Sequence, residues 1–166
     1  MASKALILDR DGVVNVETNY LYKIEEFEFI DGIIPLCLKF QQMNFKIIII
    51  TNQAGIARAL YTERDYQYLT EWMISKFKEA GVKISEVYHC PHHPEFTGPC
   101  DCRKPKPGMF LTAKAEFDLD FSSSINVGDK ETDIAAGKAA GVATNIHFKG
   151  DRFDPMVEPW KSLLIV

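Results

Sequence analysis

One run of apolar residues constrains the fold of this chain more than any other feature. Residues 45–50 read Phe-Lys-Ile-Ile-Ile-Ile, so apolar side chains occupy both faces of any strand formed there. A strand without a polar face has to be covered on both sides, which is typical of parallel strands between two layers of helices. The run therefore predicts a parallel strand of an α/β fold.

Strand-like and helix-like segments alternate along the chain. Apolar runs predict strands at residues 4–8, 45–50, 82–89, 124–127 and 142–148. Apolar residues at helical spacing predict helices at residues 33–43, 62–80, 108–117 and 131–140. Such alternation, joined by right-handed crossovers, predicts one α/β domain over residues 1–166 with a doubly wound, mainly parallel sheet.

Residues at the ends of the predicted helices support these boundaries. The signals are Asp31-Gly32 before residue 33, Thr62 with Asp65, Pro107 before residue 108, and the C-terminal stops Gly81 and Gly141. The tail of the chain ends in Leu163-Leu164-Ile165-Val166, and we expect this apolar run to dock on the body of the domain.

Composition and charge narrow the range of functions. The 166 residues are 46% hydrophobic and carry a net charge of −4, with Lys and Arg scattered through the sequence. No basic block could neutralise a run of phosphates, which argues against nucleic acid as a partner. No apolar stretch reaches the length of a signal sequence or a membrane span. We therefore expect a cytoplasmic monomer, without membrane contact, that acts on a small molecule such as a phosphate monoester.

Two aspartates follow the first predicted strand where it ends. Asp9-Arg10-Asp11-Gly12 comes directly after the apolar run 5–8. Ligands of doubly wound sheets bind beyond the carboxyl ends of the strands, and Gly12 would allow a turn that aims both carboxylates at one point. The same residues could instead form an Asx turn that merely caps the strand.

Three further polar groups lie near the ends of predicted strands or loops. They are Thr51-Asn52-Gln53 after the strand at 45–50, Arg103-Lys104 after a Cys-rich loop, and Gly128-Asp129 after the strand at 124–127. Their positions resemble that of the first aspartate pair. We therefore expect one shared site at the carboxyl edge of the sheet.

Together these side chains supply what phosphoryl transfer requires. A carboxylate nucleophile works beside a hard cation, and Mg²⁺ accepts oxygen ligands such as those of Asp9 and Asp129. Lys104 and the hydroxyl of Thr51 would balance the charge on the phosphoryl oxygens. Asp11 would protonate the leaving alkoxide and then deprotonate the attacking water.

Each of these residues also has a purely structural interpretation. Thr51 could bond locally at the end of its strand, and Lys104 could be a solvated charge. Asp129 and Asp133 could cap the helix that follows them. Their joint occurrence near strand ends favours the catalytic interpretation.

A loop at residues 90–103 is rich in Pro, Cys and His and has no helical or strand periodicity. Its conformation must therefore be stabilised by something other than a hydrophobic core. Its candidate ligands are Cys90, His92, His93, Cys100 and Cys102. Three thiolates and one histidine would form a closed tetrahedral site, which is typical of structural zinc. The alternative is a set of reduced cysteines, while Cys37, on an apolar helix face, is expected in the core.

The motifs resemble those of the haloacid dehalogenase (HAD) superfamily and, more narrowly, its heptose bisphosphate phosphatases. The segments that carry the resemblance are residues 9–15, 51–58, 90–94, 100–105 and 127–130. Histidinol-phosphate phosphatases share these motifs, including the Cys-rich loop. Phe29–Gly32 and Leu69–Met73 lean toward the heptose branch, while the stretch between His93 and Cys100 is shorter than in the heptose enzymes.

The resemblance implies a HAD-like fold and a Mg²⁺-dependent phosphatase that removes the 7-phosphate of a heptose 1,7-bisphosphate through an aspartyl-phosphate. It implies Asp9 as nucleophile, Asp11 as proton donor, and Thr51 and Lys104 as stabilisers of the phosphoryl group. The Mg²⁺ ligands would be Asp9, the backbone carbonyl of Asp11, and Asp129. The C-x-H motif selects His92 over His93, so the Zn²⁺ ligands would be Cys90, His92, Cys100 and Cys102.

The resemblance also places the sugar phosphate substrate and a supporting carboxylate. Residues expected near the substrate are Arg103, Glu17, Asn19, Tyr20, Asn52, Gln53, Ala54 and Lys130. Asp133 is expected to hold Lys104 or Lys130 by a charge-assisted hydrogen bond rather than to bind metal. A histidinol-phosphate phosphatase is the alternative within the same motifs.

Two other classes of protein are less compatible with the sequence. A phospho-receiver domain also uses acids, a Thr and a Lys, but it lacks a second acid two residues after the acceptor and needs no zinc loop. A zinc-organised binding module would leave Asp9, Thr51, Lys104 and Asp129 unexplained.

The expected site is open. The windows at residues 12–30 and 54–102 are too short for the cap domains of larger superfamily members. We therefore expect selectivity to come from the loop at 17–20, from Arg58 and from the Cys-rich loop.

Overall fold

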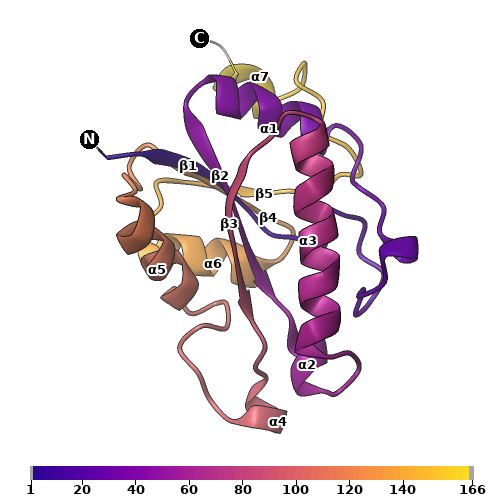
Figure 1. Cartoon of the computed structure of the whole chain (residues 1–166). Helices are drawn as coiled ribbons and strands as arrows, with labels where there is room; N and C mark the ends of the chain where they lie inside the picture. The colour runs from indigo at the N-terminus through magenta and orange to yellow at the C-terminus, as the bar shows by residue number, and fades with distance from the viewer. Residues whose placement is uncertain (1, 165–166) are drawn as a thin grey trace.

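The computed structural model describes residues 2–164 and contains one sheet (Figure 1). Its strand order is β3-β2-β1-β4-β5, and every neighbouring pair is parallel. The strands are β1 (Lys4–Leu8), β2 (Phe45–Asn52), β3 (Ile84–Cys90), β4 (Ile125–Gly128) and β5 (Thr144–His147). The predicted α/β architecture with a parallel sheet is confirmed.

Helices cover both faces of the sheet, which makes it doubly wound. α1 (Ile33–Gln42) and α3 (Glu63–Glu79) pack on one face, and α5 (Gly108–Phe117) and α6 (Glu131–Ala140) pack on the other (Figure 1). Shorter helical segments are η1 (Ile24–Glu26), α2 (Ala54–Ala57), α4 (Pro94–Thr97) and α7 (Trp160–Leu163).

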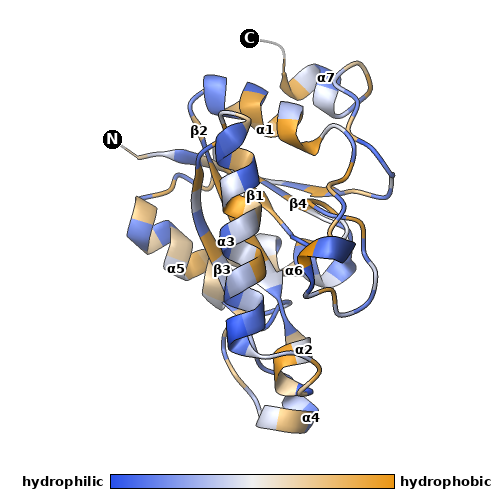
Figure 2. Cartoon of the chain, turned by 45° about the vertical axis from the view of Figure 1, so that its right-hand side comes forward, coloured by the Kyte–Doolittle hydropathy of each residue, from blue (hydrophilic) through white to orange (hydrophobic). Residues whose placement is uncertain are grey.

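The central strands bury side chains on both faces. In β2, Ile47 and Ile49 join one apolar cluster, and Ile48 joins the other together with Ile50. All four isoleucines are at most 1% exposed, so the expectation of a strand covered on each side is confirmed. Figure 2 shows the same pattern, since strand residues are hydrophobic while the outer face of α3 is largely hydrophilic.

Two predicted strands are shorter because their first residues bond elsewhere. Val82 donates its backbone N–H to the carbonyl of Phe77 (2.9 Å), so β3 begins at residue 84. Val142 likewise closes the end of α6 by donating to Gly137 (2.9 Å), and β5 begins at residue 144. The other ends of these strands each differ by one residue, since β5 ends at His147 rather than at residue 148 and β3 continues past residue 89 to Cys90.

The helix-start signals differ in outcome. Thr62 and Asp65 form a capping box at the start of α3, as predicted. The predicted cap Asp31-Gly32 does lie at the start of α1, where Gly32 is the N-cap and no side chain makes a capping hydrogen bond. The carbonyl of Asp31 instead accepts the backbone N–H of Phe153 (2.8 Å) and so joins the C-terminal segment.

The C-terminal segment docks on the domain, as expected for most of its length. Trp160, in α7, is 4% exposed and packs edge-on against Phe40 and Phe153. Leu163 and Leu164 pack on the same core cluster. Ile165 and Val166, the last two residues of the predicted apolar run, lie outside the described residues.

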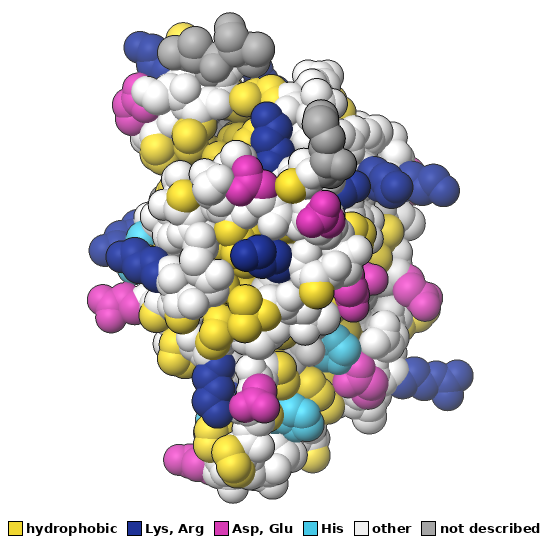
Figure 3. Space-filling model, turned by 90° about the vertical axis from the view of Figure 1, so that its left-hand side faces the viewer, with side chains coloured by type: hydrophobic (Ala, Val, Ile, Leu, Met, Phe, Trp, Pro, Cys, Tyr) yellow, Lys and Arg dark blue, Asp and Glu magenta, His cyan; other side chains and the backbone are white. Residues whose placement is uncertain are grey.

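The loops after β1 and β2 contain few elements, and the long one among them, α3, packs on the sheet. Residues 9–32 hold η1, and residues 53–83 hold α2 and α3. Within residues 2–164 neither loop forms a separate layer over the sheet edge (Figure 1). No helix in this part of the chain is long and apolar enough to cross a membrane. Acidic and basic side chains are interspersed on the face drawn in Figure 3.

Candidate active site

The ends of β1, β2 and β4 bring the predicted acids and Thr51 to one edge of the sheet. Asp9 follows β1, Thr51 is near the end of β2, and Asp129 follows β4. Gly12 permits the loop after β1 to lie close to the loop after β4. Its φ is +92°, and a Cβ there would lie 2.0 Å from Oδ2 of Asp129. Both the turn and the contact therefore require glycine.

Lys104 lies at the centre of this group and is 3% exposed. Its Nζ is 3.1 Å from Asp9 Oδ1, 2.7 Å from Asp133 Oδ1 and 2.7 Å from the carbonyl oxygen of Ile50. Burial works against the charge of Lys104, but the two carboxylates outweigh it and raise the pKa of the ammonium. Lys104 is therefore a buried, paired cation and not a solvated charge.

Three carboxylates converge next to this cation. Oxygens of Asp9, Asp129 and Asp133 lie within 4.8 Å of one another. Burial raises the pKa of Asp9 well above its usual value and raises that of Asp129 as well. Asp129 Oδ1 is buried and has no hydrogen-bond partner within residues 2–164. Such a group of acids, with one free buried oxygen, suits a hard divalent cation.

Asp133 differs from the other two acids because both of its oxygens are already bonded. One oxygen pairs with Lys104, and the other accepts the backbone N–H of Lys130 at 3.0 Å. Despite burial, the pKa of Asp133 is lowered because Lys104 favours the carboxylate. Asp133 thus caps α6 and holds Lys104 at the same time.

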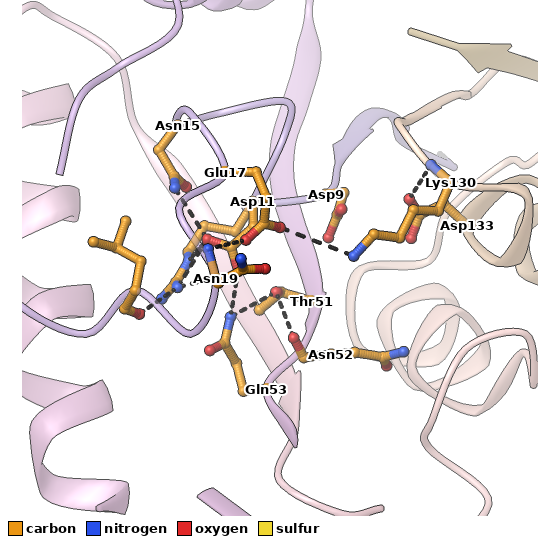
Figure 4. Close-up of polar contacts among 12 residues, drawn as sticks. Asp9, Asp11, Asn15, Glu17, Asn19, Thr51, Asn52, Gln53, Lys130 and Asp133 are labelled. Atoms are coloured by element: carbon orange, nitrogen blue, oxygen red, sulfur yellow. Dashed lines mark hydrogen bonds and ion pairs between the residues drawn. The ribbon is translucent and has the colours of Figure 1, made fainter. Parts of the chain in front are cut away.

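Asp11 is held by three donors that surround its carboxylate. Arg10 donates to both oxygens at 3.0 to 3.2 Å, and Asn15 donates to Oδ1 at 3.0 Å. Gln53 donates to Oδ2 at 3.1 Å (Figure 4). Sequence reasoning missed Arg10, Asn15 and Tyr61, whose hydroxyl donates to Gln53. The sequence signal for Arg10 was its position between the two aspartates. In the structure, its side chain is 1% exposed.

A cavity of about 360 Å³ opens over Asp11 and Lys104. The eight residues expected near the substrate line it together with Asp11 and Lys104; they are Glu17, Asn19, Tyr20, Asn52, Gln53, Ala54, Arg103 and Lys130. Tyr61 and Thr132 complete the lining. Glu17 and Lys130 face each other across it, with 3.9 Å between carboxylate and ammonium (Figure 4).

Arg58 connects two loops at the rim of the site. Its guanidinium lies 5.6 Å from the ring of Tyr20 and 5.0 Å from the ring of Phe96 in α4. These distances are those of cation–π contacts. The short helices α2 and α4 accordingly lie side by side (Figure 2).

The Cys-rich loop brings three of its four predicted metal ligands together. Sγ of Cys100 is 3.6 Å from that of Cys90 and 3.6 Å from that of Cys102. The ring of His92 does not join this group, whose donor atoms lie within 4.8 Å of one another. The ring of His93 is occupied, because its Nδ1 accepts the N–H of Glu95 (3.2 Å) at the start of α4.

Comparison with known proteins identifies the family. A model described as HAD-hydrolase-like matches residues 101–152. The D-glycero-alpha-D-manno-heptose-1,7-bisphosphate 7-phosphatase of Campylobacter jejuni is 51% identical over 146 residues, which are 88% of this chain and 83% of that protein. The D-glycero-beta-D-manno-heptose-1,7-bisphosphate 7-phosphatase of Escherichia coli K12 is 44% identical over 147 residues, 86% of this chain and 77% of that protein.

A solved structure agrees with these relatives. The D,D-heptose 1,7-bisphosphate phosphatase of B. bronchiseptica, crystallised with magnesium and phosphate, superimposes with a TM-score of 0.79 at 31% identity. The match covers 86% of this chain and 79% of that one. The chain therefore belongs to the heptose-1,7-bisphosphate 7-phosphatase family of HAD-like hydrolases.

Proposed function

We propose that this protein is a Mg²⁺-dependent phosphatase that hydrolyses the 7-phosphate of D-glycero-D-manno-heptose 1,7-bisphosphate. The observation that carries the proposal is the buried cation Lys104, held between Asp9 and Asp133 at the floor of an open polar cavity. The names of the relatives supply the substrate. The product would serve lipopolysaccharide-core or other nucleotide-heptose biosynthesis.

The residues that line the cavity and those directly behind Lys104 and Gln53 have distinct roles in this reaction. The carboxylate of Asp9 forms a bond to the 7-phosphorus while the bond from phosphorus to the sugar oxygen breaks. Asp11 gives its proton to that oxygen and then takes one from the water that cleaves the aspartyl-phosphate. Lys104 balances the negative charge on the phosphoryl oxygens, and the hydroxyl of Thr51 donates to one of them.

The acids fit Mg²⁺ by their chemistry. Asp129 offers a buried oxygen that has no partner within residues 2–164, and a divalent cation would offset the burial that raises the pKa of Asp9 and Asp129. Asp9, Asp129 and the backbone carbonyl of Asp11 would hold the ion, while Asp133 stays on Lys104. When bound, Mg²⁺ would neutralise phosphoryl and carboxylate charge that would otherwise repel.

The second phosphate of the substrate needs its own cation in the cavity. Arg103 lines the cavity next to Lys104 and reaches the carbonyl of His92 with Nη1 at 3.4 Å. Its guanidinium offers two parallel donors, which suits a phosphate far from the reacting one. We therefore assign Arg103 to the 1-phosphate, which histidinol phosphate lacks.

The three clustered thiols support structural zinc. Cys90, Cys100 and Cys102 would supply three ligands, and His92, two residues after Cys90, would turn in as the fourth. A closed site of this kind would fix the loop that carries Arg103 and Lys104. The reduced cysteines also suit a cytoplasmic enzyme, and we propose that it acts as a monomer.

A substrate panel tests the proposal. Phosphate release is measured for the alpha and beta anomers of the heptose bisphosphate, for histidinol phosphate and for simple sugar phosphates. We expect the highest kcat/KM for a heptose bisphosphate, and we expect Arg103→Ala to depress kcat/KM strongly for it but little for histidinol phosphate. Higher efficiency on histidinol phosphate would overturn the substrate assignment. Equal losses of kcat/KM on both substrates would show that Arg103 does not bind the second phosphate.

A further inference from the structure

The side-chain amide of Gln53 bridges two residues with proposed catalytic roles. Gln53 follows β2 and is 2% exposed. Its Nε2 donates to Asp11 Oδ2 at 3.1 Å and to Thr51 Oγ1 at 2.9 Å (Figure 4). Both N–H bonds of the amide are thus used within the active site.

This bonding pattern requires one orientation of the amide. The carboxylate of Asp11 accepts hydrogen bonds and already receives donors from Arg10 and Asn15. A flipped amide would turn its own oxygen toward that carboxylate, so two acceptors would face each other. The oxygen of Gln53 must therefore point away, into a buried region where it needs a donor.

Tyr61 supplies that donor. Its hydroxyl hydrogen-bonds to Oε1 of Gln53, and its ring is 5% exposed. Burial raises the pKa of Tyr61, which keeps the hydroxyl protonated at neutral pH. The donor is therefore present under the conditions in which the enzyme would work.

The ring of Tyr61 is itself fixed by its neighbours. It stacks on Tyr22 with 5.4 Å between ring centroids and an interplanar angle of 16°. A Cβ at Gly55 would lie 2.1 Å from Cε1 of Tyr61, so the glycine in α2 leaves the space that the ring fills. The hydroxyl is thus presented from a rigid position.

We propose that Tyr61 is a positioning residue, which fixes the amide of Gln53 so that its two N–H groups hold Asp11 and Thr51 in place for phosphoryl transfer. This inference rests on the proposed roles of Asp11 and Thr51. Tyr61 needs no contact with the reacting phosphoryl group.

The test uses Tyr61→Phe, which keeps the ring against Tyr22 and Gly55 and removes only the donor. We expect kcat to fall about tenfold to a hundredfold, the scale of a small misplacement of catalytic groups, with KM within about twofold of wild type. Tyr88→Phe is the matched control, because the hydroxyl of Tyr88 donates to Glu116 on the outer surface. It should leave kcat and KM unchanged. Wild-type kcat in Tyr61→Phe would overturn the proposal.

A double-mutant cycle shows whether Tyr61 acts through Gln53. Gln53→Ala removes the amide, so adding Tyr61→Phe to it should cause no further loss of kcat. Losses that multiply would mean that Tyr61 acts by another route and would overturn the proposal. Thermal unfolding of each variant with Mg²⁺ identifies any loss that comes from unfolding.

The cycle can be separated from the substrate assignment. The cycle is run with p-nitrophenyl phosphate as well as with the heptose bisphosphate. If the wild type hydrolyses only p-nitrophenyl phosphate, the proposed function is refuted, but the kcat values of the four proteins on p-nitrophenyl phosphate still test the role of Tyr61. The side-chain NH₂ signals of ¹⁵N-labelled Gln53 give a readout without turnover. We expect them to be protected from exchange in the wild type and to lose that protection in Tyr61→Phe. Identical signals in both proteins would overturn the proposal whatever the substrate.

Discussion

The ammonium of Lys104 and the carboxylate of Asp133 form a buried ion pair, with 2.7 Å between Nζ and Oδ1, directly beside Asp9. Asp133 is fixed in turn by the first turn of α6, where it accepts the N–H of Lys130. A helix cap thus positions the cation of the active site.

Lys104→Met should lower both activity and stability. Removing the cation leaves Asp133 and Asp9 buried without their partner, which costs on the order of 3 kcal/mol of unfolding free energy. Urea unfolding in EDTA measures this loss. Lys130→Met is the control, because the Lys130 side chain is 63% exposed and its removal should change the unfolding free energy by less than about 1 kcal/mol. Equal stability of Lys104→Met and wild type would contradict the ion pair.

Gly12→Ala should abolish Mg²⁺ binding and turnover. The new methyl group would collide with Asp129, and a left-handed residue costs about 1 kcal/mol in addition. Gly141→Ala separates these effects, since Gly141 has a φ of +96° with no atom near the new Cβ among the described residues. Calorimetric titration with Mg²⁺ should show binding to Gly141→Ala and none to Gly12→Ala. Normal binding to Gly12→Ala would refute the close approach.

The stabilisation of the protein by Mg²⁺ should grow as the pH rises. Burial raises the pKa of Asp9 and Asp129 above their unfolded values, so in the metal-free protein their contribution to stability is lost as the pH rises through the folded values. Mg²⁺ binds the deprotonated acids and offsets this loss. The increase in Tm on adding Mg²⁺, measured from about pH 5 to about pH 8, should therefore be smallest in acid. A constant increase would exclude these acids as the ligands.

Purified protein should contain zinc bound by the Cys-rich loop. Cys100→Ser should remove the zinc and lower Tm, because the loop at residues 90–103 has little apolar core of its own. Cys37→Ser is the control. Cys37 is buried in α1 and does not belong to the cysteine cluster, so this variant should keep its zinc. Elemental analysis checks both variants. A wild-type protein without zinc would contradict the structural site.

The sheet was predictable because its central strands are buried on both faces. The isoleucines of β2 leave only one way to bury them, and the positions of Asp9, Thr51 and Asp129 follow from the parallel order of the strands. The first residues of β3 and β5 were not predictable. Val82 and Val142 are β-branched and apolar, as strand residues are, yet their backbone N–H groups bond to the ends of the preceding helices.

The network around Asp11 was not predictable from spacing. Tyr61 reaches Gln53 only because α2 folds the chain back and Gly55 leaves room for its ring. The contact of Asp31 was not predictable either, since its backbone carbonyl accepts the N–H of Phe153 in the C-terminal segment. The hydrogen bond from Gln53 to Asp11 spans 42 residues, and the one from Phe153 to Asp31 joins segments that are also far apart in sequence.

The reaction itself gives the most direct test of the proposed mechanism. ³¹P NMR follows the heptose 1,7-bisphosphate with Mg²⁺ in the presence of wild type or Asp9→Asn, a nearly isosteric change that removes the nucleophile and a metal ligand. We predict that wild type releases the 7-phosphate and leaves the heptose 1-phosphate, while Asp9→Asn remains folded and releases none. Release of the 1-phosphate by wild type, or turnover near the wild-type rate by Asp9→Asn, would contradict hydrolysis of the 7-phosphate through an aspartyl-phosphate on Asp9.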